Sequence, residues 1–307
     1  MHINLHLLRI FCAVAEHRSF SRAAASLFIS QPAVSKAVPE LERQLDLPLI
    51  ERGGGGPRGA KGVRLTESGQ ALFEHGRGIF ALERAATDEM RARVGLKRGR
   101  LVVGASTTIA GYWLPPYVAT FARLYPSTQL QIRVGNTQSV GRDLIGCEID
   151  VALVEGAIDD RRIVASHWRD DELQIIARFG APLARRRKPS REDLNAQVWL
   201  LREPGSGTRE VTDGLMRAHR IDPERTVEFG SNEGIARAVA AGLGIAMLPA
   251  RVTRELTRMG EVKALALPHL PAPALMRPLY LLQLRERPPS PLVRGFCELL
   301  SRALETR

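Results

Sequence analysis

From residue 100 onward, short apolar runs alternate with helix-like segments, and this alternation restricts the fold more than any other feature of the chain. The runs and segments alternate over residues 100–106, 108–125, 130–136, 139–148 and 149–156. A strand that returns through a helix comes back in the same direction, so this order builds a parallel sheet. The pattern predicts a doubly wound α/β domain.

A second series of strands and helices follows the first. Its expected elements cover residues 172–177, 197–201, 207–220, 225–231, 232–242, 244–249, 261–267, 277–286 and 288–305. We therefore expect residues 96–307 to form two α/β lobes. Lobe one takes residues 96–168 and 268–307, and lobe two takes residues 169–267.

Polar residues gather where several expected strands end and the next helices begin. In doubly wound sheets ligands bind at this edge, outside the carboxyl ends of the strands. The stretches "GASTT", "GNTQS", "EPGSGTR" and "GSNEG" supply the candidate ligand-binding residues Ser106, Thr107, Thr108, Thr137, Gln138, Gly205, Ser206, Gly207, Thr208 and Asn232.

Hydroxyl groups and free N–H groups at helix starts favour an anion. Arg209 is the only basic residue that we expect at these starts, so the predicted site consists mainly of neutral donors and suits a small, compact anion. Two alternatives remain open. The hydroxyl groups can be ordinary helix caps, or a larger apolar or aromatic ligand can stack on Tyr112 or Trp113.

The stretch "ISQPAVSKAVPELERQL" at residues 29–45 predicts an amphipathic helix near the other end of the chain. One apolar face recurs at helical spacing through Val34, Val38, Leu41 and Leu45. Ser30 is a suitable N-cap, and Pro32 stands in the first turn, where its missing N–H costs nothing. Pro39 lies inside the helix and should bend it.

Two further helices precede this one, around residues 7–15 and 21–28, and a brief turn separates the second from the third. This arrangement predicts a helix-turn-helix, whose last helix enters the major groove of DNA. Gln31 can pair with an adenine edge, Ser35 and Lys36 can reach bases or phosphates, and Pro32 can touch a thymine methyl.

The stretch "ERGGGGPRGAKGVRLTESG" predicts a wing, because four glycines cannot hold a helix and "GVRLT" is typical of a strand. Its spacing does not match a phosphate-binding P-loop. Residues 1–66 hold nine Lys or Arg against five Asp or Glu, which favours a polyanion partner. The candidate DNA-contacting residues are Ser30, Gln31, Pro32, Ser35, Lys36, Arg52, Arg58, Lys61 and Arg64.

A long helix is predicted from Glu67 to about Val94, with Thr66 as its N-cap. Apolar residues recur along it at a spacing of about seven, which is typical of a seam buried against a second copy of the helix. The candidate dimerisation residues are Leu72, Ile79, Leu82 and Ala86.

The sequence also argues against several classes of protein. The chain has no apolar run long enough to span a membrane and no secretory signal pattern. Its three cysteines are far apart and suit a reducing cytosol. No metal-spaced cluster appears, and Ser206 stands in GSG rather than GxSxG, so we expect neither catalysis nor a cofactor. The alternative is a small-molecule-binding protein or enzyme with an accessory basic domain.

The order of these parts resembles the LysR-type transcriptional regulators. The resemblance is carried by "FSRAAASLFISQPAVSKAVPELE", "GVRLTESG" and "AVAAGLGIAMLP". It implies an N-terminal all-α winged helix-turn-helix at 1–66, a linker and dimerisation helix at 67–95, and a two-lobed α/β effector-binding domain at 96–307. That last domain would resemble periplasmic binding proteins.

The resemblance also implies a set of partners. These are double-stranded promoter DNA, a small-molecule effector between the lobes, and further copies of the chain in a homodimer or homotetramer, with RNA polymerase as an additional candidate. The stretch "PGSGTR" is similar to family members tied to carbon fixation and to sulfur-oxyanion sensing, which favours a small inorganic or carboxylate effector. A cytoplasmic location follows from promoter binding.

Overall fold

The computed structural model describes residues 2–51, 63–93, 99–156, 158–267 and 275–302. Contacts divide the chain into two compact units, Met1–Thr87 and Asp88–Arg307. Each unit has its own hydrophobic core.

The first unit contains α1 (Leu5–His17), α2 (Phe20–Leu27), α3 (Gln31–Leu45) and most of α4 (Glu67–Arg93). The predicted apolar face of α3 is confirmed, because all four of its residues are buried. They pack with α1 and α4 in one core that includes Leu8, Phe11, Val34, Val38, Leu41, Leu45 and Phe80. The helix-turn-helix is therefore held together by burial of one side of α3.

Pro39 does not end the helix, since α3 continues to Leu45. Three residues further on from Pro39, Glu42 is 8% exposed and turns inward. Its Oε1 accepts hydrogen bonds from the backbone N–H groups of Leu49 at 2.7 Å and Ile50 at 3.1 Å. Ile50 then pairs with Leu65 in an isolated antiparallel bridge, so Glu42 anchors the base of the predicted wing.

Lobe one, in the second unit, is built on three parallel strands: β1 (Gly99–Ser106), β2 (Thr128–Gly135) and β3 (Val151–Glu155). Its helices are α5 (Thr107–Tyr112), α6 (Pro115–Leu124), α7 (Thr137–Ile145) and α13 (Pro291–Ser301). One face of the sheet packs against α6 and α13, and the opposite face packs against α7. The predicted alternation of strand and helix is confirmed here.

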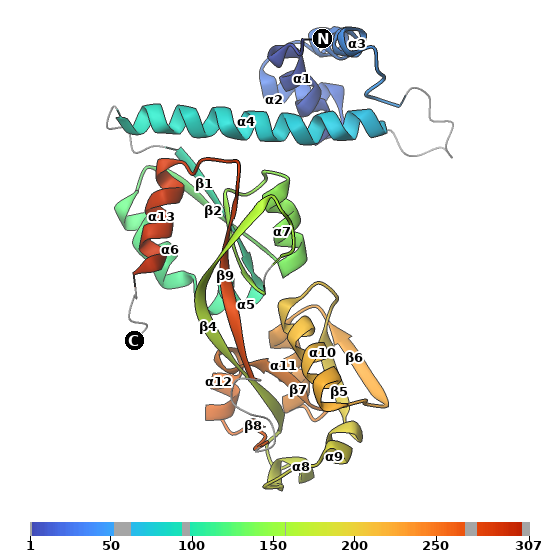
Figure 1. The fold of residues 1–307 in the computed structure, drawn as a ribbon, viewed down its shortest axis with the longest axis vertical. Helices are drawn as coiled ribbons and strands as arrows, with labels where there is room; N and C mark the ends of the chain where they lie inside the picture. Colours follow the sequence, from blue (N-terminus) through green and yellow to red (C-terminus); the bar gives the residue numbers. More distant parts are fainter. Residues whose placement is uncertain (1, 52–62, 94–98, 157, 268–274, 303–307) are drawn as a thin grey trace. The chain divides into compact units, whose positions relative to one another are not determined.

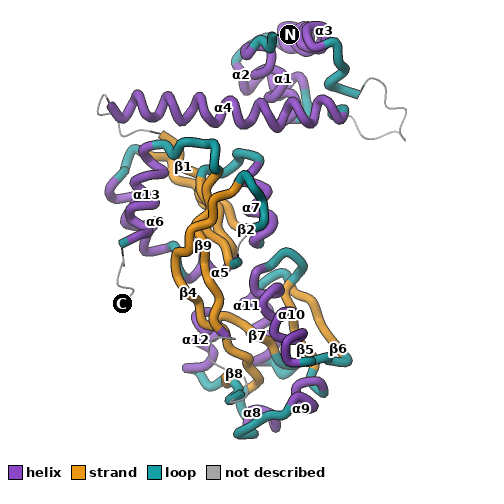
Figure 2. Tube along the Cα trace, viewed as in Figure 1, coloured by secondary structure: helices purple, strands orange, loops and turns teal. Residues whose placement is uncertain are grey.

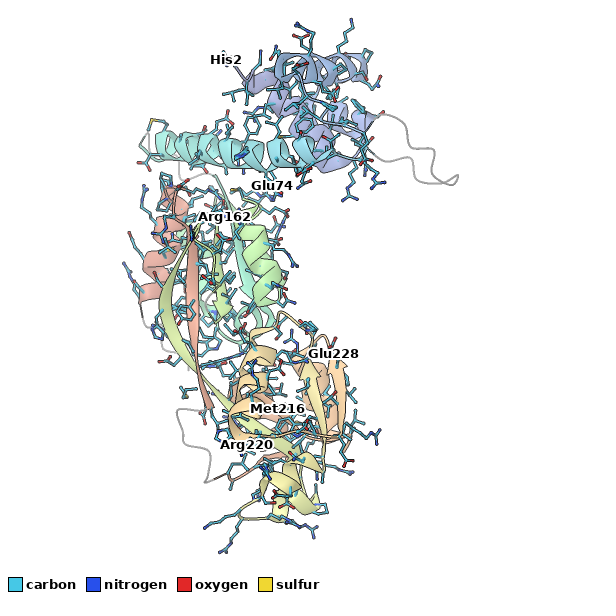
Figure 3. All side chains as sticks on the ribbon, turned by 45° about the vertical axis from the view of Figure 1, so that its right-hand side comes forward. His2, Glu74, Arg162, Met216, Arg220 and Glu228 are labelled. Carbon is cyan, nitrogen blue, oxygen red and sulfur yellow. The ribbon has the colours of Figure 1, made fainter. Side chains whose placement is uncertain are left out.

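Lobe two contains a parallel pair of strands and several short helices around the end of the larger sheet (Figure 2). Its strands are β5 (Val198–Arg202), β6 (Arg225–Phe229), β7 (Ala246–Pro249) and β8 (Val262–Ala264). Its helices are α8 (Pro182–Arg185), α9 (Arg191–Asn195), α10 (Gly207–His219), α11 (Asn232–Ala240) and α12 (Ala250–Arg258). Met216 of α10 belongs to one apolar cluster (Figure 3), and α11 with α12 forms another.

Two long antiparallel strands, β4 (Ile163–Arg178) and β9 (Met276–Leu284), run through both lobes (Figure 1). The sequence predicted β4 only from residue 172 and predicted no antiparallel pairing. That expectation was wrong because the first half of β4 leaves most of its side chains exposed, so it lacks the apolar run that marks a buried strand.

The three cysteines, Cys12, Cys147 and Cys297, are free thiols. Burial raises the pKa of Cys12 to about 12 and that of Cys297 to about 11, which keeps both thiols protonated at neutral pH. Among the described residues, no helix is both long and apolar enough to cross a bilayer.

Replacing Glu42 with Ala should destabilise the first unit by about 2 to 3 kcal/mol, because one buried and one partly buried backbone N–H group lose a charged acceptor. Glu42→Gln keeps one acceptor oxygen in the same place and should recover most of that loss. Chemical denaturation of the three proteins measures the difference. Equal stability of Glu42→Ala and wild type would show that water replaces the carboxylate at no cost.

Candidate functional site

Four predicted helix starts meet where lobe one faces lobe two. The amide Nδ2 of Asn232, at the start of α11, donates to Thr108 Oγ1 of α5 at 2.9 Å. The backbone N–H of Gln138, at the start of α7, donates to the carbonyl of Gly205, just before α10, at 3.1 Å. The segments that the sequence selected therefore lie in direct contact across the two lobes.

Not every predicted hydroxyl is a helix cap. Ser106 accepts the backbone N–H of Ile109 at 3.4 Å and caps α5. At α7, Asn136 caps the helix instead, and Thr137 Oγ1 lies 3.0 Å from the carbonyl oxygen of Glu155. Ser206 occupies the N-cap position of α10 but makes no side-chain cap bond. Capping alone does not account for the hydroxyl groups of Thr137 and Ser206.

The guanidinium of Arg277 lies at the centre of this site, and its side chain is 1% exposed. Its Nε and Nη2 donate to Asp171 Oδ2 at 3.0 and 2.7 Å, and Asp171 is its partner in the β4–β9 register. Its Nη1 donates to Thr208 Oγ1 at 2.9 Å, and its Nη2 to Thr108 Oγ1 at 3.5 Å. The sequence did not predict this buried cation, which lies on β9 rather than at a helix start and joins two of the predicted hydroxyls.

Glu155, at the end of β3, brings a second buried carboxylate to the same cation. Its Oε1 lies 3.4 Å from Arg277 Nη2, and the residue is 3% exposed. Burial raises the pKa of Asp171, and the positive charge of Arg277 opposes that rise. With both carboxyl groups ionised, Arg277, Asp171 and Glu155 together carry one formal negative charge.

A second buried arginine lies beside the first group. Arg202, at the end of β5, donates to both carboxylate oxygens of Glu203 at 2.7 and 2.9 Å and to Thr107 Oγ1 at 3.2 Å. The predicted Arg209 is half-buried, with its Nη1 on the Arg202 carbonyl at 2.8 Å and its Nε 2.9 Å from Asp213 Oδ1.

Sequence reasoning missed the charged members of the site. Their common signal is a charge placed at the end of an apolar strand, such as Glu155 after "VALV", Arg202 after "VWLL" and Arg277 before "PLYLL". A charge in that place must find a partner when the strand is buried. A charge at the end of an apolar strand could therefore have identified these three residues from the sequence.

The hydroxyl groups retain donor capacity. Ser106, Thr108, Ser206 and Thr208 are each 5% exposed or less. A hydroxyl has one hydrogen and two lone pairs. Thr108 and Thr208 use lone pairs to accept from Asn232 and Arg277, so their own hydrogens are left for another acceptor. An anion supplies such acceptors.

Little space is left for an aromatic ligand to stack on Trp113 or Tyr112. The Arg251 guanidinium lies 3.8 Å from the ring centroid of Trp113, over its face, and Trp168 packs against the same ring at 5.8 Å. Tyr112 packs against the apolar cluster of α11 and α12. Stacking on Trp113 would require Arg251 to move.

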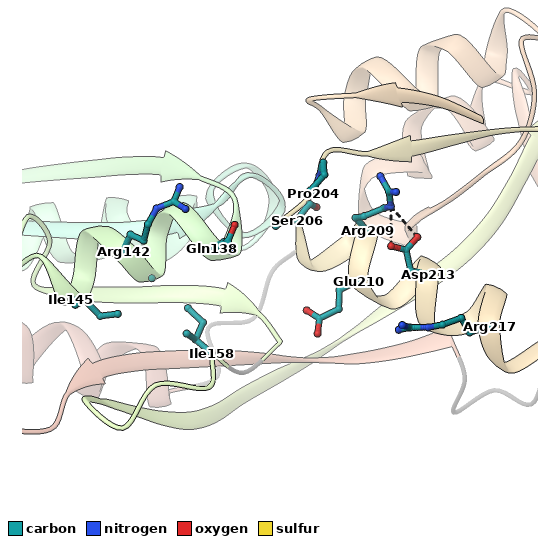
Figure 4. A pocket seen from close by; sticks show the side chains of 12 residues that line it. Gln138, Arg142, Ile145, Ile158, Pro204, Ser206, Arg209, Glu210, Asp213 and Arg217 are labelled. Carbon is teal, nitrogen blue, oxygen red and sulfur yellow. Dashed lines mark hydrogen bonds and ion pairs between the residues drawn. The ribbon is translucent and has the colours of Figure 1, made fainter. Parts of the chain in front are cut away.

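A cavity of about 480 Å³ lies between α7 and α10, and Ser206 is the one of the four buried hydroxyl residues that lines it (Figure 4). Gln138, Gly205 and Ser206 belong both to its lining and to the predicted set. Arg142 of α7 and Arg217 of α10 add exposed positive charge to opposite walls. The cavity gives a small molecule access to one side of the site.

The predicted DNA-reading residues lie on the exposed start of α3. Gln31 Nε2 donates to Ser35 Oγ at 2.9 Å, and Ser30 caps the helix through the N–H of Ala33. Gln31, Pro32 and Lys36 are exposed. In the wing, Arg64 is exposed and pairs with Glu51 at 3.3 Å, whereas the predicted contacts Arg52, Arg58 and Lys61 lie outside the described residues.

The predicted seam on α4 divides into two parts. Leu72 is half-buried and packs against the core of the helix-turn-helix. Ile79, Leu82 and Ala86 are exposed. The uncovered apolar stripe therefore begins at Ile79.

Comparison with known protein families gives two matches. Residues 5–70 match the model for bacterial regulatory helix-turn-helix proteins of the lysR family, and residues 95–305 match the model for the LysR substrate binding domain. The helix-turn-helix-type transcriptional regulator YeiE of Escherichia coli K12 is 35% identical over 298 residues, covering 97% of each chain.

Solved structures agree with these matches. A full-length OxyR variant from Pseudomonas aeruginosa has a TM-score of 0.76 at 24% identity, covering 98% of this chain and 94% of that one, and it supports the fold. The CcmR regulatory domain of Synechocystis PCC6803, in complex with 2-PG, has a TM-score of 0.60 at 28% identity and covers 66% of this chain and 96% of that one. The chain therefore belongs to the LysR family of transcriptional regulators, which are not enzymes.

Proposed function

We propose that this regulator reads promoter DNA with the start of α3 and responds to a small anion bound between its two lobes. One observation carries the effector class: the buried hydroxyl groups of Thr108 and Thr208, from two lobes, meet at the Arg277 guanidinium. The buried hydroxyls of Ser106 and Ser206 lie at the starts of the same two helices.

Helix starts add to this preference for an anion. Each favours a nearby negative charge by about 0.3 to 1 kcal/mol, and by more when partly buried. Asp171 and Glu155 more than offset the charge of Arg277, so the anion must be compact enough to reach the hydroxyl groups without bringing its bare oxygens close to the carboxylates. The complex of the similar CcmR domain with 2-PG supports a small ligand in this class of domain.

The proposed mechanism links the lobes to the DNA. An anion that bridges α5 and α10 favours one arrangement of the two lobes over others. In a homodimer or homotetramer joined by α4, that change alters the spacing of the DNA-reading helices. The proposal includes contact with RNA polymerase at the promoter and a cytoplasmic location, where the chromosome lies.

Gln31→Ala should reduce discrimination between the target promoter and unrelated DNA by about 1 to 3 kcal/mol, because a bidentate contact to a base edge is lost. Binding titrations on both DNAs measure this. As a control, Arg64→Ala should weaken binding to both DNAs alike and reduce the salt slope by about 1. Equal losses on both DNAs for Gln31→Ala would rule out base reading by Gln31.

Ile79→Asp should dissociate the proposed dimer at micromolar protein, because it places an unpaired charge in the apolar stripe of α4. Light scattering gives the mass in solution. Gln70→Asp introduces the same charge on the opposite face of α4 and should leave the dimer intact. A stable dimer of Ile79→Asp would place the interface elsewhere.

The double variant Ser106→Ala, Thr208→Ala should bind its anion at least about tenfold more weakly than wild type, since two donors are removed. Calorimetric titration with sulfite, sulfate, phosphate and small carboxylates measures this, and Thr226→Ala, an exposed hydroxyl on β6, serves as control. If no anion binds wild type, or if the double variant binds one undiminished, the hydroxyl-lined anion site is wrong and the aromatic alternative gains weight.

A further inference from the structure

Glu155 is a buried carboxylate whose contacts with neighbouring polar groups are long. Its Oε2 lies 3.3 Å from Thr137 Oγ1, and its Oε1 lies 3.4 Å from Arg277 Nη2. Bonds to ionised groups are usually about 2.7 to 2.9 Å long. Arg277 makes its short contacts with Asp171 instead, at 2.7 and 3.0 Å. Glu155 therefore has acceptor capacity to spare.

Asn232 supplies a second unused acceptor in the same group. The residue is fully buried, and its Oδ1 has no hydrogen-bond partner among the described residues. Its Nδ2 donates to Thr108, which also accepts from Arg277. A buried acceptor without a donor is costly and rare in native proteins. One acceptor without a partner and one carboxylate with only long contacts, beside the hydroxyls of Thr108 and Thr208, indicate a ligand that both accepts and donates.

The backbone keeps Glu155 in place. A Cβ at Gly207 would lie 2.5 Å from the Glu155 Cβ and 2.7 Å from its carbonyl oxygen. The start of α10 therefore packs directly on Glu155, one residue before Thr208. This contact holds the carboxylate beside the hydroxyl groups.

We propose that Glu155, assisted by Asn232, selects a compact oxyanion that carries a hydrogen over one that carries none. The inference rests on the proposed anion site. The hydroxyls of Thr108 and Thr208 donate to the bare oxygens of the ligand, and the O–H of the ligand donates to the Glu155 carboxylate. An anion without a hydrogen turns lone pairs toward that carboxylate and is repelled.

Inorganic phosphate and sulfate separate these cases, because they share size and tetrahedral shape. Phosphate carries at least one hydrogen at neutral pH, and sulfate carries none. A site built to accept a hydrogen bond from its ligand rejects an analogue that lacks the donor. Calorimetric titration of the full chain at neutral pH should give at least about tenfold tighter binding of phosphate than of sulfate.

Glu155→Gln should remove this preference. The glutamine has the same shape and offers an N–H to a sulfate oxygen, so sulfate should bind more tightly and phosphate less tightly than to wild type. Glu172→Gln is the matched control, since Glu172 is the exposed neighbour of Asp171 on β4. Its ratio of the two affinities should equal that of wild type.

The outcomes are distinct. Equal or tighter binding of sulfate by wild type overturns the selection by Glu155 but leaves an anion site in place. Binding of neither phosphate nor sulfate overturns the selection, and if sulfite and the small carboxylates also fail to bind, the small-anion effector is overturned with it. A preference for phosphate that persists in folded Glu155→Gln removes Glu155 from the selection. Thermal unfolding without ligand establishes that the variant is folded, and the wild-type ratio tests the selection without any variant.

Discussion

The effector-binding domain depends above all on the buried ion pair between Asp171 and Arg277. It joins β4 to β9 where the two strands pass between the lobes, and both side chains are 1% exposed. Removing Arg277 would leave two buried carboxylates without a cation, which is strongly destabilising. Because the same guanidinium bonds to Thr108 and Thr208, the pair also fixes the positions of hydroxyl groups from both lobes.

The two units of the chain use burial differently. In the first unit an apolar face of α3 fixes the helix, and the polar start of that helix is left exposed. In the second unit the candidate site is itself buried, so each polar group needs a partner or a ligand. The proposed DNA-reading surface and the proposed small-molecule site therefore place opposite demands on their polar residues.

The sequence predicted the helix-turn-helix, the length of α4 and the parallel part of each lobe, because these depend on local periodicity and capping. It predicted the hydroxyl groups of the site, since helix starts after strands can be recognised locally. It missed β4 before residue 172 and the partnership of Arg277 with Asp171, which are 106 residues apart in the chain. Pairing at such a distance depends on the register of two strands, and no local pattern encodes it.

The candidate site draws its members from two kinds of element. The hydroxyl groups belong to helix starts, whereas Glu155, Asp171, Arg202 and Arg277 belong to strands. Helix starts that donate N–H and O–H groups suit almost any anion. A substitution at a strand end can change the charge and donor pattern of the pocket while leaving the caps intact. Related domains could thus diverge in ligand by changing strand residues alone, with the helical frame and its attached DNA-reading apparatus inherited unchanged.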